Sequence, residues 1–190
     1  MKGLEPLFRR LSAFRRAQRG VAAVEFALVV PIMLAVYIGT LEASTLISMD
    51  RKVQSVASAV GDLVARADKT ISQNQIRDYF RAASGVMTPY SSDPVLQVIT
   101  AVRVSNDGIA TVAWSRQFTN GAYATTTPHR DGTAYPLPNE MIAISKGQMV
   151  IAAEASYAYT PLFGIVFNQP IHLYRSSFFL PRFGGTIGIN

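Results

Sequence analysis

The chain contains no cysteine, which excludes disulfide bonds, thiolate metal sites and a cysteine nucleophile. Histidine is nearly as scarce: His129 and His172 are the only two, and neither has an acidic neighbour in the sequence at the spacing of metal ligands. The sequence also lacks a phosphate-binding glycine loop, a nucleophile elbow and paired histidines on a helix. We therefore expect no catalytic residue, no metal and no cofactor. The absence of cysteine does not assign a compartment, because exported proteins can lack disulfides.

Charge is also scarce, and it is unevenly distributed. Only 16% of the 190 residues are Asp, Glu, Lys or Arg, and the net charge is +6. Residues 1–20 contain six basic residues and one acidic residue, so five of the six net positive charges lie there. The remaining chain is nearly neutral, which argues against nucleic-acid binding. The length suggests one domain with an appendage.

One long stretch is almost free of charge. The 21 residues from Val21 to Leu41 include Glu25 as the only charged residue, and roughly 20 apolar residues suffice for a helix to cross about 30 Å of hydrocarbon. We predict a transmembrane helix over residues 21–45. A cleaved secretory signal fits less well, because the basic leader is long and the bulky Leu41 would stand three residues before the cut. Since Lys and Arg gather on the cytoplasmic side, residues 1–20 form a cytoplasmic leader and residues 46–190 an exported domain.

Small residues recur every fourth position along this predicted helix. The row comprises Ala23, Ala27, Pro31, Ala35, Gly39 and Ala43. Small side chains let membrane helices approach closely, so the row is either a helix-packing surface or a reflection of frequent alanine. Pro31 lacks an N–H group and crowds the carbonyl of Ala27, which predicts a kink or a loosened turn.

The start of the apolar stretch carries a recognisable motif. Gly20-Val21-Ala22-Ala23-Val24-Glu25-Phe26 resembles the prepilin cleavage motif of the Flp/Tad branch of type IV pili, which has a glycine, four residues, a glutamate and an aromatic residue behind a basic leader. The longer stretch RGVAAVEFALVVPIMLAVYIGTLEAS, beginning at Arg19, is similar to the TadE-like (TadE/TadF) pseudopilins. Phe26 replaces the tyrosine that major pilins prefer, which favours a minor pilin. The later motifs YAYTP and FLPR are also similar, over few residues.

The resemblance implies cleavage by a prepilin peptidase between Gly20 and Val21. Cleavage would create an α-amine at Val21 that is protonated below a pKa of about 8. Glu25, four residues along the helix, would face this amine or that of a neighbouring subunit and set the register between subunits. The alternative is an interfacial glutamate without a partner. Gly20 suits a peptidase pocket that needs close backbone approach, or it is an ordinary flexible boundary.

Residues beyond the membrane stretch predict an α+β domain. One apolar stripe continues the first helix to about residue 67; it consists of Leu46, Met49, Val53, Val56, Val60 and Leu63. A capping box at Ser72–Gln75 begins a second helix. Strands are expected at 98–104 and 109–114, joined by a turn at 106–108, and at about 148–159 and 171–180. Residues 119–140 read as a long surface loop. We expect a pilin-like fold, with a long helix packed on a small antiparallel sheet.

These features and the resemblance together predict a minor pilin or pseudopilin of the Tad secretion and Flp pilus assembly system. The expected location is the bacterial inner membrane, in a single pass, with the domain in the periplasm; whether the protein enters the pilus or its tip stays open. The expected partners are the prepilin peptidase, other Tad minor pilins, the Flp-type major pilin and the Tad inner-membrane assembly platform.

Two other classes of protein are alternatives. One is a signal-anchored periplasmic binding domain that is not cleaved by the peptidase. The other is a glycan hydrolase using Glu140 and Glu154 as a carboxylate pair. The sequence favours Glu140 as a loop charge and Glu154 as a solvent-facing strand residue.

Overall fold

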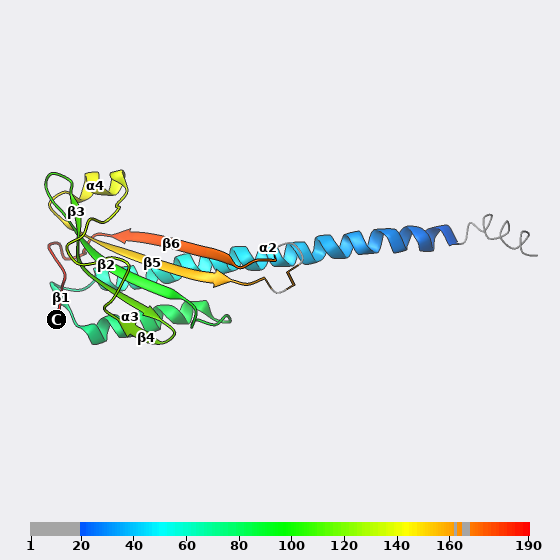
Figure 1. Cartoon of the computed structure of the whole chain (residues 1–190), viewed down its shortest axis with the longest axis horizontal. Coiled ribbons are helices and arrows are strands. Elements are labelled where there is room, and N and C mark those ends of the chain that lie inside the picture. The colour runs from blue at the N-terminus through cyan, green and yellow to red at the C-terminus, as the bar shows by residue number, and fades with distance from the viewer. Residues whose placement is uncertain (1–19, 162, 165–167) are drawn as a thin grey trace, which may run out of the picture.

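A computed structural model describes residues 20–161, 163–164 and 168–190. The predicted leader, Arg19 included, therefore lies outside the described residues. A long helix, α2 (Val21–Ala65), projects from a domain that contains a five-stranded antiparallel sheet (Figure 1). The predicted α+β architecture is confirmed.

Helix α2 is a single element in two different environments. Its 45 residues continue through Pro31 without a break and extend roughly 68 Å at 1.5 Å per residue. The half before Leu41 is exposed, whereas the half after it packs against β5, β6 and α3. Burial follows the predicted stripe to Val60 and then moves to Val64 rather than Leu63. The shift arises because 3.6 residues per turn make a stripe drift slowly around the helix.

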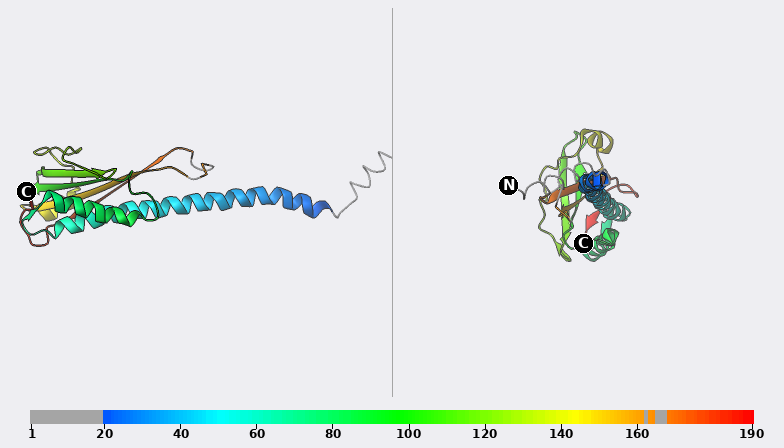
Figure 2. Two further views of the ribbon diagram at one scale, coloured as in Figure 1. Left: turned by 90° about the horizontal axis from the view of Figure 1, so that it is seen from below. Right: turned by 90° about the vertical axis from the view of Figure 1, so that its right-hand side faces the viewer.

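The sheet has the strand order β4-β3-β2-β5-β6, with every neighbouring pair antiparallel. Its strands are β2 (Leu96–Val104), β3 (Ala110–Thr119), β4 (Ala122–Ala124), β5 (Met149–Tyr159) and β6 (Ile171–Phe179). The four longer strands confirm the predicted ones. Both α2 and α3 lie against the same face of this sheet (Figure 2). A separate parallel pair, β1 (Thr70–Ile71) with β7 (Gly188–Ile189), was not predicted, because two-residue strands have no periodicity to detect.

Helix α3 (Gln73–Ser84) begins at the predicted capping box. The hydroxyl of Ser72 accepts a hydrogen bond from the Gln75 N–H at 3.2 Å, and the Gln75 side chain accepts one from the Ser72 N–H at 2.9 Å. Ile76, Phe80 and Ala83 are its buried side chains. A short 3-10 helix, η2 (Gly85–Met87), follows, and Lys52 Nζ on α2 donates to the carbonyls of Val86 at 2.9 Å and Thr88 at 2.7 Å. These bonds tie the end of α3 to the long helix.

The predicted surface loop at 119–140 proves to be a cover for the second face of the sheet. It includes β4, and Tyr135 and Leu137 are buried against Val102 and Val150. A short helix, α4 (Asn139–Ser145), follows and was not predicted. The reason is visible in β2 and β5, whose near-continuous apolar runs mark strands buried on both faces. Such strands need a cover on each side, and here the loop supplies the second one.

The C-terminal segment fastens the end of α2. The backbone N–H of Arg182 donates to the Ala65 carbonyl at 2.8 Å, and its guanidinium bonds the Asp62 carboxylate. The indole N–H of Trp114 donates to the Ile187 carbonyl at 2.7 Å. The FLPR motif thus contacts the helix end directly.

Gly61 is the point of closest approach between α2 and the sheet. A Cβ added there would lie 2.5 Å from the Phe179 ring and 2.8 Å from the Ala153 Cβ. We expect Gly61→Ala to lower the free energy of unfolding by about 1–3 kcal/mol, the usual cost of overpacking. Denaturation of the detergent-solubilised chain, followed through the single tryptophan Trp114, measures this change. Gly85→Ala is the matched control, because a Cβ there meets nothing within 4 Å; equal stability of the two variants would contradict the close packing.

Candidate functional site

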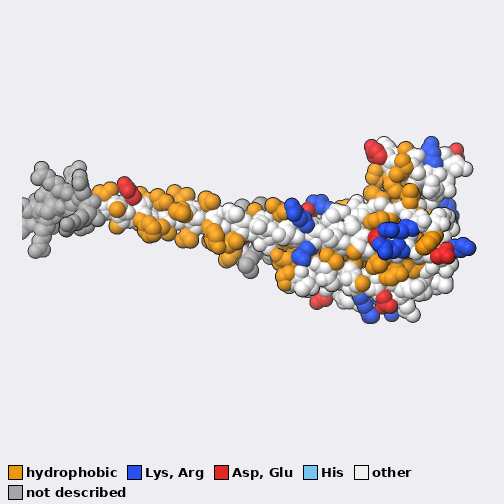
Figure 3. Space-filling model, turned by 180° about the vertical axis from the view of Figure 1, so that it is seen from behind, with side chains coloured by type: hydrophobic (Ala, Val, Ile, Leu, Met, Phe, Trp, Pro, Cys, Tyr) orange, Lys and Arg blue, Asp and Glu red, His pale blue; other side chains and the backbone are white. Residues whose placement is uncertain are grey.

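The exposed half of α2 is the largest apolar feature of the surface. Between residues 21 and 41, large side chains face outward all round the helix, Phe26 being 70% exposed, and Figure 3 shows a stalk that is almost entirely hydrophobic. An 18-residue window here has a mean hydropathy of 2.4, and in the described residues this is the only helix long and apolar enough to span a membrane. A surface of this kind requires lipid or protein around it. The helix therefore indicates membrane anchoring.

Gly20 and Val21 lie where helix α2 begins. Gly20 is the N-cap, with φ −93° and ψ −14°, and no side chain caps the helix. An added Cβ at Gly20 would meet no atom within 4 Å. The backbone angles suit any residue, so packing within the described part of the chain does not require a glycine here. Both Gly20 and Val21 are exposed among the described residues.

Glu25 lies one helical turn after Val21 and faces outward. Within the described residues it forms no ion pair or hydrogen bond. Residues four apart share one face of a helix, so its carboxylate can reach the start of α2. The geometry leaves Glu25 available for a partner that the described chain does not supply.

The predicted row of small residues divides into an exposed and a partly covered section. Ala27, Pro31 and Ala35 are exposed, whereas Gly39 and Ala43 are half-buried near the domain. The hydroxyl of Thr40 donates to the Val36 carbonyl at 2.8 Å, so this polar group is satisfied inside the helix. The first three positions are thus open to close contact with another helix.

Glu42, at the end of the apolar stretch, is a functional candidate that the sequence reasoning missed. It is only 2% exposed, and its carboxylate accepts a hydrogen bond from the Phe163 N–H at 3.1 Å. The pKa of Tyr159 is raised mainly by burial and, to a smaller extent, by the neighbouring Glu42 carboxyl. The domain therefore reaches α2 at residue 42, within the segment predicted to cross the membrane. The glutamate was visible in the sequence, but its partner lies on a distant hairpin.

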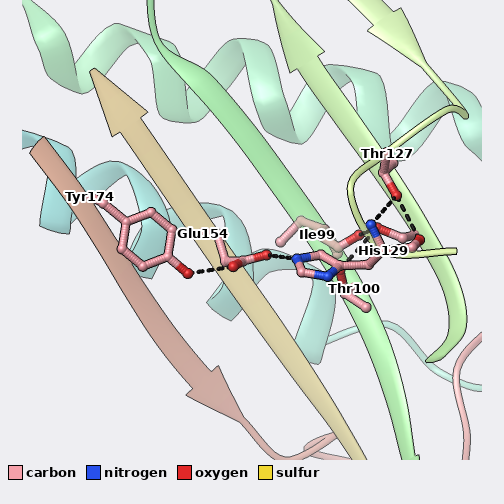
Figure 4. Close-up of polar contacts among 7 residues, drawn as sticks. Ile99, Thr100, Thr127, His129, Glu154 and Tyr174 are labelled. Carbon is pink, nitrogen blue, oxygen red and sulfur yellow. Dashed lines mark hydrogen bonds and ion pairs between the residues drawn. The ribbon is translucent and has the colours of Figure 1, made fainter. Parts of the chain in front are cut away.

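A second cluster joins His129, Glu154 and Tyr174 (Figure 4). Glu154 was expected to face solvent, and this prediction is wrong: it is 8% exposed. One carboxylate oxygen lies 2.7 Å from His129 Nε2, and the other accepts a hydrogen bond from the Tyr174 hydroxyl. His129 therefore does have an acidic neighbour, brought to it by the fold. Its backbone is also held by Thr127, whose hydroxyl accepts from the His129 N–H at 3.2 Å.

A cavity of about 290 Å³ lies beside this cluster. Its other walls are mostly apolar and include Leu96, Val98 and Pro128. Both oxygens of Glu154 are engaged, and no second carboxylate lines the cavity among the residues that the structure describes. Glu140 is exposed in the first turn of α4, so the carboxylate pair that a glycan hydrolase would require is not assembled from these two residues. The cluster instead fastens the loop at residues 119–140, here called the covering loop, to β5 and β6. In the described residues, no group of three His, Asp or Glu side chains could hold a metal ion.

Comparison with known proteins agrees with the motif at the start of α2. Residues 20–62 match the family model described as TadE-like protein. No curated protein and no solved structure matches the chain. The matched region begins at Gly20, contains Glu25 and Glu42, and ends one residue after Gly61. The match confirms the resemblance over this helix and supports a pilus-related protein of the Tad system.

The covering loop makes stability sensitive to alkaline pH. The pKa of Tyr135 is raised above its usual range, mainly by burial and to a smaller extent by the neighbouring Glu154 carboxylate. An unfolded tyrosine loses its proton near pH 10, whereas the folded one keeps it to higher pH. The stabilisation is therefore complete below about pH 10 and is lost as the pH rises further. We expect the free energy of unfolding to fall above that pH, and less steeply in Tyr135→Phe.

Denaturant titrations from about pH 8 to 11, read through Trp114, measure this slope. Tyr37→Phe is the control, since this residue is 62% exposed on the stalk and lies outside the domain core. Identical slopes for Tyr135→Phe and the unmodified protein would show that Tyr135 does not control the alkaline transition.

Proposed function

Since residues 20–62 are TadE-like, we propose that this chain is a minor pilin or pseudopilin required for assembly of a Tad (Flp-type) pilus. Helix α2 anchors the chain in the bacterial inner membrane, with residues 1–20 in the cytoplasm and the sheet domain in the periplasm. A prepilin peptidase removes the leader between Gly20 and Val21. The observation that carries this proposal is the position of Glu25, which has no partner among the described residues and lies one turn inside helix α2, directly after its N-cap Gly20.

The surroundings of Gly20 support recognition by another protein. Neither its backbone angles nor its neighbours within the described chain require a glycine. A glycine that the fold does not need is consistent with a constraint from outside, such as a peptidase pocket that must approach the backbone closely. The exposed start of α2 gives such an enzyme access to the peptide bond.

Cleavage would place two opposite charges at one end of a membrane helix. The new Val21 amine would add a positive charge to a helix end that is already electropositive. Glu25 can offset this charge within its own helix or across a contact to a neighbouring subunit. An unpaired charge at the membrane centre costs about 2.5–3.5 kcal/mol on insertion scales. Pairing lowers that penalty, so the carboxylate favours the one alignment of subunits in which it meets an amine.

The exposed stalk provides the surface for assembly. Ala27, Pro31 and Ala35 would let another helix approach closely, and dispersion contacts would then hold the two together in lipid. We expect the neighbouring helices to be those of other Tad minor pilins and of the Flp-type major pilin. The inner-membrane assembly platform would be the third partner. The rival function, an uncleaved anchored binding domain, needs neither Gly20 nor Glu25.

The first test is the N-terminal residue of the protein isolated from its native membrane. We expect Val21 when the prepilin peptidase is present and an intact leader when the peptidase gene is deleted. Gly20→Val should block processing, because its side chain obstructs close approach, while the domain keeps its stability. Leu28→Ala, elsewhere on the exposed stalk, is the control and should be processed normally. A leader that is retained in both strains would favour the anchored binding domain.

The second test separates processing from assembly. We expect Glu25→Gln to be cleaved at Val21 and to keep the stability of the domain, but to lower the number of surface pili by about tenfold, the factor equivalent to about 1.4 kcal/mol. Electron microscopy of cells with the chromosomal substitution measures pilus number. Glutamine keeps the size of the side chain, so the loss would report the charge alone. Normal piliation with normal processing would exclude the proposed charge pairing.

A further inference from the structure

The β5–β6 hairpin returns to α2 at the point where the exposed stalk begins. Strands β5 and β6 extend along the helix towards its apolar half (Figure 1), and the connection between them contacts Glu42 through the Phe163 N–H. Glu42 directly follows Leu41, the last residue of the long apolar stretch and itself 40% exposed. Phe163 therefore lies level with the end of that stretch.

Phe163 is an exposed apolar side chain in an uncharged segment. It is 51% exposed, although its backbone is fixed to Glu42. No Asp, Glu, Lys or Arg occurs from Ala155 to Tyr174, whereas charged side chains are spread over the domain surface in Figure 3. Tyr159, the last residue of β5, lies close enough to Glu42 for the carboxyl to raise the pKa of Tyr159, after the larger effect of burial. Aromatic side chains gathered at the end of an apolar helix are typical of a membrane–water interface.

The length of the stalk places this region at the membrane surface. The 21 residues from Val21 to Leu41 rise roughly 31 Å as a helix, which matches the thickness of the hydrocarbon core. Because α2 is continuous, a membrane that covers this stretch ends close to Glu42. The Phe163 side chain would then face the lipid at the outer surface rather than open water.

We propose that Phe163, between β5 and β6, is a second membrane contact of this protein. Phe163 inserts its ring at the boundary between the headgroups and acyl chains of the outer leaflet, and Glu42 holds the backbone at that depth. The occupant of this surface is lipid, because the surface is continuous with the membrane helix and carries no charge that would select a protein partner. The contact would fix the tilt of the domain against the membrane before assembly, which goes beyond the proposed pilin function.

The absence of cysteine makes a direct depth measurement possible. A nitroxide label on Phe163→Cys, in the full chain reconstituted into phosphatidylcholine–phosphatidylglycerol vesicles, reports collisions with oxygen, which concentrates in lipid, and with a nickel chelate, which stays in water. Tyr37→Cys is the matched control within the span. Ile109→Cys is the matched control outside it, since Ile109 is 61% exposed and follows the end of β2 that pairs with the start of β5, away from Glu42. Trp114 fluorescence verifies that each variant is folded.

We expect the ratio of oxygen to nickel collisions at position 163 to resemble that at position 37 and to exceed that at position 109. Adding Glu42→Ala should lower the ratio at 163, whereas Glu42→Gln, which keeps a carbonyl acceptor, should preserve it. A ratio at 163 equal to that at 109 would overturn the proposal. Protection from both reagents would also overturn it, because a second protein would then cover the ring. A low ratio at position 37 would show that helix α2 does not span the membrane, and it would therefore overturn this contact as well.

Discussion

The packing of the second half of α2 on β5 and β6 is the contact on which the rest of the structure depends. Val53, Val56 and Val60 are fully buried in it, and Gly61 lets the ring of Phe179 approach the helix backbone. Because α2 is continuous, this contact also fixes the direction in which residues 21–41 leave the domain. The exposed apolar stalk is therefore a consequence of the core, since the sheet is too short to cover the whole helix.

Local sequence patterns predicted the parts of the fold that local interactions determine. The apolar stripe of α2, the cap at Ser72 and the turn at 106–108 each depend on residues a few positions apart. The predicted four long strands follow from their apolar runs and turn residues. Even here, the buried stripe of α2 ends on Val64 rather than on Leu63. Alternating steps of three and four residues average 3.5 residues per turn, whereas an α-helix has 3.6.

The interactions that the sequence could not predict join residues far apart in the chain. Glu42 meets Phe163 across 121 residues, and His129 meets Glu154 across 25. The sequence of β5 nevertheless indicated that Glu154 needs a partner, because it is the one charged residue in a run rich in alanine, valine and isoleucine. A lone charge in a strand buried on both faces needs a partner, which the covering loop provides. The TadE-like motif at Gly20 and Glu25 required no such long-range information, because all of its residues lie within one segment.

The acidic residues of α2 form a series that distinguishes folding from assembly. Asp62 bonds Arg182, Asp50 lies 2.6 Å from Arg175, and Glu42 accepts from the Phe163 N–H. All three partners come from the final hairpin and the segment after it, so these acids hold the domain to its helix. Glu25 is the fourth acid, and it extends beyond the reach of that hairpin on the exposed stalk. No described part of the chain can satisfy it, and removing an unpaired carboxylate from such a stalk would not weaken the fold. Under the proposed function, this carboxylate would act in contacts beyond the folded domain, at the Val21 amine that cleavage would create or in the next subunit.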